Sequence, residues 1–232
     1  MSAIYLLLNL FTLSYPLYKS FDKRVDYYGK WRFIGVAIVL VGAFFIVWDH
    51  LFTIWGVWSF NSDYLIGIYF FSLPLEEWLF FLTVPFACVF IHEVLKYFIK
   101  KPLLTTAVKP ITFVLVALFI VVALSNVEKQ YTFVNFLVAA ITLAVHWVIF
   151  GKKYLGQFYI TYLVHLVPFL IINGVLTALP VVEYNNMENL GIRLFTIPIE
   201  DTVYSMSLLF MNLSIYEYLM AKAKPSKVAA TL

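Results

Sequence analysis

The stretch LPLEEW, residues 73–78, places two adjacent carboxylates behind a proline, and a similar stretch, IPIED, occurs at residues 197–201. A constant offset of 124 aligns residues 49–98 with residues 173–222 without a gap, and twelve of those fifty positions are identical. Self-similarity of this kind indicates that one structural unit occurs twice in the chain. The repeat therefore predicts that the two acidic motifs occupy equivalent positions in the fold.

The composition predicts an all-α, polytopic membrane protein. Of the 232 residues, 63% are hydrophobic and 12% are charged, and the mean hydropathy is +0.90. This balance lies far outside that of a soluble globular domain. Seven apolar runs are long enough to be helices across a hydrocarbon core of about 30 Å. They cover approximately residues 3–18, 33–55, 75–98, 111–126, 131–150, 158–179 and 199–221.

The repeat pairs the first three predicted helices with the last three and leaves the fourth as a connector. The connector is a single helix, and an odd number of membrane crossings between the halves makes both halves run in the same direction. They are therefore expected to be parallel repeats related by an axis along the membrane normal. The predicted organisation is a three-helix repeat at 1–98, a linker with the fourth helix at 99–130, a second repeat at 131–221 and a basic cytoplasmic tail at 222–232.

The basic residues predict the orientation in a cell membrane. If the amino end lies outside, only Lys129 and Arg193 of the 16 Lys and Arg residues fall outside, and all the others lie in inner loops or the tail. Cytoplasmic loops carry such an excess of Lys and Arg. We therefore expect the N-terminus outside and the C-terminus in the cytoplasm.

Helix geometry places the acidic residues at one depth. Glu76 precedes Lys96, the expected inner anchor of its helix, by twenty residues, which corresponds to about 30 Å. We therefore expect one layer in the outer third of the membrane. Its members are Asp49, Glu76 and Glu77, with their counterparts Asn173, Glu200 and Asp201. The apolar stretch 64–73 is expected to fold over this layer as a short lid.

The duplication favours a functional role for Glu76, Glu77, Glu200 and Asp201 over simple capping of a solvated helix start. Pro74 and Pro198 precede the acids, and proline at a helix start leaves them in the first turn, where the helix dipole favours negative charge. An acid near the centre of a membrane helix costs roughly 2.5–3.5 kcal/mol, and several are tolerated when they face one another, water or a substrate. Adjacent helix positions differ by about 100°, so one member of each pair should aim inward, and spacing does not say which.

Other kinds of site are not indicated. The four histidines lack metal-ligand spacing, and no glycine motif for a dinucleotide or a phosphate is present. No continuous basic stripe suggests nucleic acid, and a single cysteine, Cys88, excludes an internal disulfide. We therefore expect no metal, cofactor or nucleic-acid partner, while the tail is expected to lie against anionic membrane lipid. The sequence leaves the oligomeric state open.

The segments FNSDYLIGIYFFSLPLEEWLFFLTVPF and LTALPVVEYNNMENLGIRLFTIPIED resemble the two halves of the small membrane-embedded lycopene cyclases. This family is found as a heterodimer of three-helix subunits in some bacteria and as the cyclase part of fungal fusions with phytoene synthase. The resemblance covers about residues 3–98 and 131–221. Its acidic P-x-E-E/D motif occurs here as Pro74, Glu76, Glu77 and as Pro198, Glu200, Asp201. Asn173 opposite Asp49 departs from the symmetry of the two halves.

The resemblance implies a redox-neutral, cofactor-independent cyclisation of the ψ-ends of lycopene, or another linear carotenoid, to β-rings. Such chemistry requires one neutral carboxylic acid and one carboxylate in a dry pocket. Burial raises a carboxyl pKa, and two acids in contact cannot easily both ionise. Aromatic faces stabilise a carbocation by roughly 0.5–2 kcal/mol each. The candidates near the acidic layer are Trp48, Trp55, Trp58, Trp78 and Tyr204.

Two other functions were weighed from the sequence. A small-solute or proton-coupled transporter also suits a 3 + 1 + 3 arrangement of parallel repeats. Against it, the predicted helices lack the string of polar side chains that a hydrophilic solute requires. A retinal-binding protein with a Schiff base in the last helix is excluded, because residues 198–221 contain no lysine.

Overall fold

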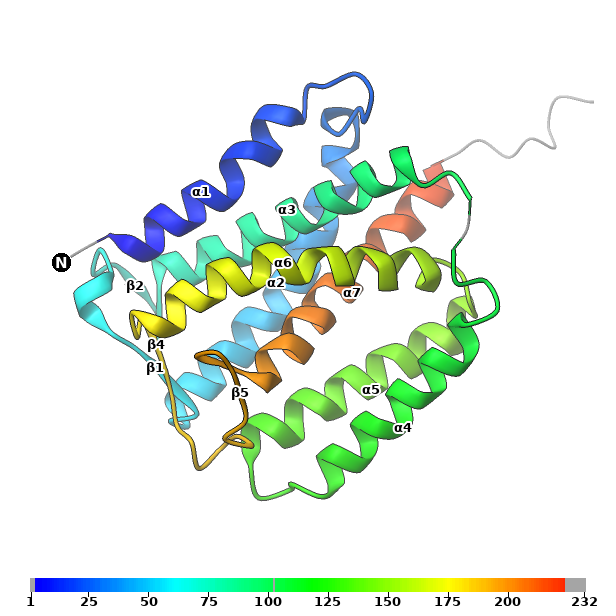
Figure 1. The fold of residues 1–232 in the computed structure, drawn as a ribbon. Helices are drawn as coiled ribbons and strands as arrows, with labels where there is room; N and C mark the ends of the chain where they lie inside the picture. The colour runs from blue at the N-terminus through cyan, green and yellow to red at the C-terminus, as the bar shows by residue number, and fades with distance from the viewer. Residues whose placement is uncertain (1–2, 102, 224–232) are drawn as a thin grey trace, which may run out of the picture.

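The computed structural model describes residues 3–101 and 103–223, and these residues form a bundle of seven α-helices (Figure 1). The predicted basic tail lies outside the described residues from position 224 onward. The helices are α1 (Ile4–Lys19), α2 (Trp31–Ile54), α3 (Leu75–Phe98), α4 (Val108–Leu124), α5 (Gln130–Phe150), α6 (Leu155–Ala178) and α7 (Ile199–Ala223). One-turn 3-10 helices at Tyr28–Lys30 and Ser62–Tyr64 complete the helical part.

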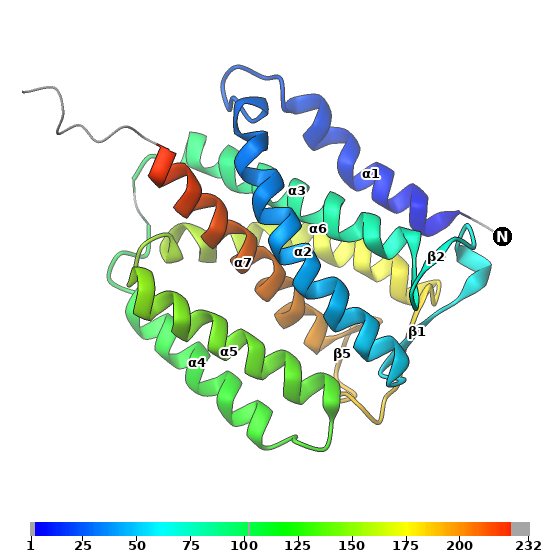
Figure 2. The ribbon, with the colours of Figure 1, turned by 180° about the vertical axis from the view of Figure 1, so that it is seen from behind.

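Four segments are long and apolar enough to cross a membrane, in agreement with the prediction of a helical membrane protein. They are Tyr28–Ile54, Leu75–Phe98, Gln130–Phe150 and Leu155–Ala178. α4 is also apolar but shorter. α1 begins at one end of the bundle and α7 ends at the opposite end (Figures 1 and 2). The crossing of the membrane by all seven helices, and the side on which each end lies, stay predictions.

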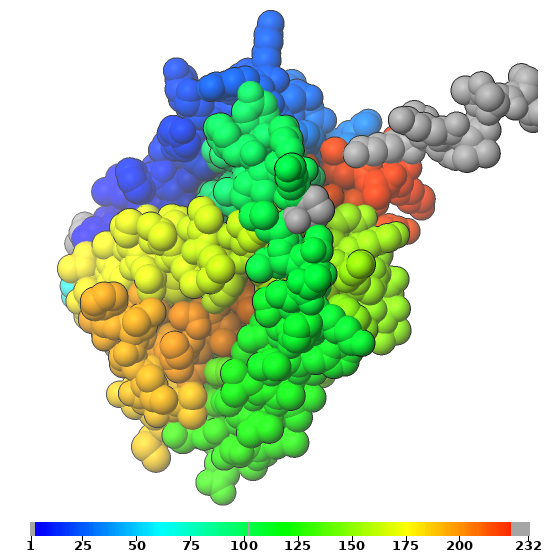
Figure 3. Space-filling model, turned by 45° about the vertical axis from the view of Figure 1, so that its right-hand side comes forward, coloured from blue at the N-terminus to red at the C-terminus, as the bar shows by residue number. Residues whose placement is uncertain are grey.

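The offset of 124 residues relates the elements of the two halves as well as their sequences. α6 begins and ends 124 residues after α2, and α7 begins 124 residues after α3. α5 is the counterpart of α1. α4 lies on the outside of the bundle against α5, as expected for a connector (Figures 1 and 3).

A short antiparallel sheet joins the two halves. Its strands are β1 (Trp58–Phe60) and β4 (Val182–Tyr184), and Ser59 lies opposite Glu183, its own counterpart 124 residues later. A strand that pairs with its own repeat copy in this register lies on the pseudo-two-fold axis between the halves. The axis therefore runs through this sheet, at the end of the bundle where the acidic motifs lie.

Each acidic motif follows a β-hairpin. β2 (Tyr69–Phe70) pairs with β3 (Leu73–Pro74), and β5 (Arg193–Leu194) pairs with β6 (Ile197–Pro198). The proline at the end of each hairpin directly precedes the first residue of α3 or α7. Gly67 and Gly191 precede the hairpins with φ values of 84° and 74°, which glycine adopts without steric cost. The lid expected at residues 64–73 is therefore a turn and a hairpin.

Candidate active site

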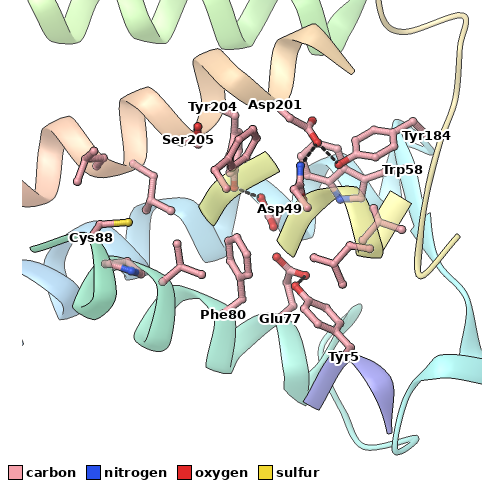
Figure 4. A pocket seen from close by; sticks show the side chains of 18 of the residues that line it. Tyr5, Asp49, Trp58, Glu77, Phe80, Cys88, Tyr184, Asp201, Tyr204 and Ser205 are labelled. Carbon is pink, nitrogen blue, oxygen red and sulfur yellow. Dashed lines mark hydrogen bonds between the residues drawn. The ribbon is translucent and has the colours of Figure 1, made fainter. Parts of the chain in front are cut away.

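Acidic side chains from both repeats line one cavity near the hairpins (Figure 4). Asp49 of α2, Glu77 of α3 and Asp201 of α7 face this space, and their exposed fractions are 3%, 6% and 5%. Aromatic side chains form much of the remaining wall. They are Tyr5, Trp58, Phe60, Phe80, Tyr131, Phe169, Tyr184 and Tyr204. The cavity thus combines three buried carboxyl groups with a largely aromatic surface.

Asp49 and Glu77 are neighbouring carboxyl groups that point toward each other in the cavity (Figure 4). Tyr5 Oη donates to Glu77 Oε2 at 2.6 Å, and Tyr204 Oη donates to Asp49 Oδ1 at 2.5 Å. Two buried carboxyl groups that lie side by side do not both ionise easily, so such a pair tends to hold one proton. This pair is therefore suited to hold and release a proton.

Asp201, in contrast to Asp49 and Glu77, accepts hydrogen bonds from three side chains. Its Oδ1 accepts from Tyr131 Oη at 2.5 Å, and its Oδ2 accepts from Asn173 Nδ2 and Tyr184 Oη, both at 2.7 Å. Burial, followed by the nearby charge of Asp201, raises the pKa of Tyr184 well above its ordinary value, so this phenol stays protonated and donates. Three donors stabilise an ionised carboxylate. Asp201 is therefore suited to stay charged and to accept a proton.

The first acid of each motif points away from the cavity and into its hairpin segment. Glu76 Oε1 accepts the backbone N–H of Ile66 at 2.7 Å, and Glu200 Oε1 accepts that of Leu190 at 2.7 Å. Both glutamates are 0% exposed. The sequence left open which acid of each pair turns inward, and the structure places the second one in the cavity and the first one against the hairpin segment.

The sequence does not predict Tyr184 at this site, nor two tyrosines and two asparagines of α1 and α5. Tyr5 and Tyr131 donate to the inward acids, while Asn9 and Asn135 donate to the backbone oxygens of the two glutamates that hold the hairpins. These positions are 126 residues apart, so the ungapped offset of 124 does not align them. α1 and α5 share too few other residues for a sequence signal to reveal the relation.

The aromatic residues predicted near the acids occupy different places. Trp58 and Tyr204 line the cavity. Trp48 packs behind Tyr204, with ring centroids 5.2 Å apart. Trp78 lies on the other side of α3, stacked on Phe71 of the hairpin with centroids 6.3 Å apart. Another predicted residue, Trp55, is half exposed.

A second group of charged residues lies toward the other end of α3 and α7. His92, Glu93 and Glu217 have potential ligand atoms within 4.8 Å of one another. Lys96 Nζ, however, lies 2.8 Å from Glu93 Oε1 and 2.5 Å from Glu217 Oε1, and Lys30 Nζ lies 2.6 Å from Glu93 Oε2. Two ammonium groups thus already neutralise the two carboxylates, and the group is an ion-pair network.

Comparison with protein families places these observations in context. The family model described as lycopene cyclase matches residues 2–95 and again residues 128–219, which together form most of the chain. A search of curated proteins and a search of solved structures each found no match. Nothing in these comparisons supports the transporter alternative. With the match repeated in both halves, the chain belongs to the lycopene cyclase family.

Proposed function

We propose that this protein is a lycopene β-cyclase that converts the ψ-ends of lycopene, or of another linear carotenoid, to β-rings and gives β-carotene by way of γ-carotene. In this proposal all seven helices cross the cell membrane, with the N-terminus outside. The observation that carries the proposal is the meeting of two neighbouring buried acids, Asp49 and Glu77, with Asp201, a carboxyl group that accepts three hydrogen bonds, in one aromatic cavity. The family match supports the substrate class.

The pair of Asp49 and Glu77 is the proposed acid. It transfers its proton to C2 of the terminal double bond, which leaves a tertiary cation at C1. The neighbouring C5=C6 double bond attacks this cation, so the C1–C6 bond forms and the positive charge moves to C5. General acids of this kind work best when burial and a neighbouring acid keep the proton available at neutral pH.

Asp201 is the proposed base. It accepts the proton from C6, and the electron pair of that bond forms the C5=C6 double bond of the β-ring. No redox partner is needed, because one proton is gained at C2 and one is lost at C6. Loss of the proton from Asp201 to the solvent, with uptake of a solvent proton by the pair of Asp49 and Glu77, restores the starting state for the next ring.

The walls of the cavity favour the cationic intermediates. The rings of Trp58, Tyr131 and Tyr204 line the cavity beside the acids, and an aromatic face in contact with a cation contributes roughly 0.5–2 kcal/mol. The Asp201 carboxylate adds charge that is fixed before the reaction begins. These groups also exclude water, which would otherwise capture the cation as an alcohol.

Expression in cells that accumulate lycopene tests the proposal directly. We expect the wild-type chain to convert lycopene to β-carotene, and membranes in D₂O to yield product with one deuterium at C2 of each ring. Lycopene that stays unchanged in a well-expressed sample would overturn the function. A product without deuterium would overturn protonation by an exchangeable acid.

Variants test the assigned roles. Glu77→Gln and Asp201→Asn are each expected to abolish ring formation while the protein still inserts into the membrane. The matched control is Glu183→Gln, which alters an exposed carboxylate on β4, outside the cavity. Full activity of either cavity variant, or equal loss in the control, would contradict the assignment.

A further inference from the structure

A second, apolar groove lies between α1, α3 and α6. It encloses about 280 Å³. Its walls are almost entirely apolar or aromatic, and they include Phe11, Tyr15, Ala87, Phe90, Pro168 and Ile172. The side chains of Phe11 and Tyr15 are 68% and 62% exposed, so the groove reaches the molecular surface. A groove of this composition suits a hydrocarbon and offers few partners to a polar solute.

The groove adjoins the acidic cavity. The residues that line both spaces are Phe80, Val84, Cys88, His165, Phe169 and Asn173. These residues run from the second turn to the middle of α3 and from the middle to the last third of α6, and both helices are suited to cross the membrane. The open side of the groove therefore faces the lipid hydrocarbon, from which a carotenoid has to enter.

The corresponding space in the other half is filled. The offset of 124 residues places Phe45 and Trp48 of α2 at the positions of Phe169 and Ile172 of α6. Phe45 and Trp48 stack with centroids 5.4 Å apart, and Tyr204 packs against them at 5.0 and 5.2 Å. Phe45 is 0% exposed and Trp48 5%. The acidic cavity thus adjoins an open groove on the side of Ile172, whereas packed aromatic rings fill the equivalent space on the side of Trp48.

We propose that the groove between α1 and α6 binds the polyene body of the linear substrate while one end of the molecule reaches Asp49, Glu77 and Asp201. This inference rests on the proposed function and adds the path of the substrate. Because the groove approaches the acids from one side, the two ends of a carotenoid react one after the other, with withdrawal of the first ring between the two steps.

A substitution that copies the closed half tests the proposal. Ile172→Trp introduces the residue found at position 48 and is expected to fill the groove. The matched control is Ile171→Trp, one position away on the lipid-facing side, where the native side chain is 60% exposed and outside the groove. We expect Ile172→Trp to lower lycopene conversion by about tenfold or more, which corresponds to at least about 1.4 kcal/mol, and Ile171→Trp to leave conversion unchanged.

Full conversion of lycopene by Ile172→Trp would contradict substrate binding in the groove and leave the proposed cyclase function unaffected. If Ile172→Trp fails to insert, Thr12→Trp on the α1 wall gives the same test, with Leu10→Trp as its exposed control. Pigment that co-purifies with inactive Glu77→Gln protein provides a readout independent of catalysis. We expect bound lycopene there, and its loss when Ile172→Trp is added; retention in the double variant would contradict the groove.

Discussion

Asn173 Nδ2 lies 2.7 Å from Asp201 Oδ2, at the position where the other half of the molecule places Asp49 against Glu77. The offset of 124 residues relates Asn173 to Asp49 and Asp201 to Glu77. Glu77 and Asp201 therefore have different neighbours, because Glu77 lies beside the acid Asp49 and Asp201 lies beside the amide of Asn173. Asn173 donates to Asp201 through its NH₂ group and has no acidic proton to transfer, whereas Asp49 and Glu77 are two acids that can hold one proton between them.

Asn173→Asp should therefore reduce cyclisation strongly. The new acid would share a proton with Asp201, so the proposed base would no longer be free to accept the proton from the substrate. We expect a loss of about a hundredfold, on the scale of a removed general base, measured as the rate of β-carotene formation in isolated membranes. Asn126→Asp makes the same change away from the cavity and should retain the rate. Equal rates in the two variants would contradict the division of roles.

Tyr5, one of the four tyrosines that donate to the inward acids, provides a second prediction. Tyr5→Phe removes a donor to Glu77 and leaves its ionised form less stable, so the proton is released to the substrate less readily. A hydrogen bond to a charged group contributes roughly 1.5–3 kcal/mol, so we expect a tenfold to hundredfold slower rate, at the scale of about 1.4 kcal/mol per factor of ten. Tyr18→Phe, on an exposed part of α1, is the control. An unchanged rate in Tyr5→Phe would remove Tyr5 from the mechanism.

Much of this site could be predicted from the sequence because the repeat has a constant offset across residues 49–98 and 173–222, which contain both acidic motifs. The offset of 124 predicts that the two motifs are equivalent, and every strand and two of the helix pairs obey it. It does not predict which acid turns inward, since adjacent helix positions are both plausible until the neighbours are known. The orientation of the acids depends on the backbone N–H groups of Ile66 and Leu190, which donate hydrogen bonds to Glu76 and Glu200 and hold them away from the cavity.

Other features depend on contacts between segments that the sequence does not relate. Tyr5 and Tyr131 belong to helices with a different offset, so a fixed alignment leaves them unpaired. The hairpins require a positive φ at Phe71 and Phe195, 56° and 58°, and phenylalanine gives no signal for that conformation. The groove is open where Ile172 stands at the position of Trp48 in the other half, and an isoleucine gives no signal of this in an apolar helix.

Glu76 is expected to be a positioning residue, and a pair of variants can separate this role from acid catalysis. Gln at this position keeps the oxygen that accepts the Ile66 N–H, so Glu76→Gln should retain most of the cyclisation rate. Glu76→Ala leaves a buried N–H without its acceptor, at a cost of about 1–3 kcal/mol, and should lower both thermal stability and rate. Melting temperature and β-carotene formation are measured together. A Gln variant as inactive as Glu77→Gln would instead place Glu76 in the chemistry.

The ion-pair network at the other end of the bundle is expected to affect stability alone. Lys96→Met removes the ammonium group between Glu93 and Glu217 and leaves two partly buried carboxylates with reduced compensation. Breaking a buried pair costs roughly 3–5 kcal/mol, and because Lys96 is about one-third exposed we expect about 1–2 kcal/mol.

This loss should appear as a melting temperature lower by about 2–8 °C in detergent, with an unchanged cyclisation rate per folded molecule, because the network lies away from the cavity. Lys101→Met removes an exposed charge from the loop after α3 and should leave the melting temperature within about 1 °C, since isolated surface charges contribute little. A selective loss of rate in Lys96→Met, without a change in melting temperature, would connect the network to the reaction and contradict its structural role.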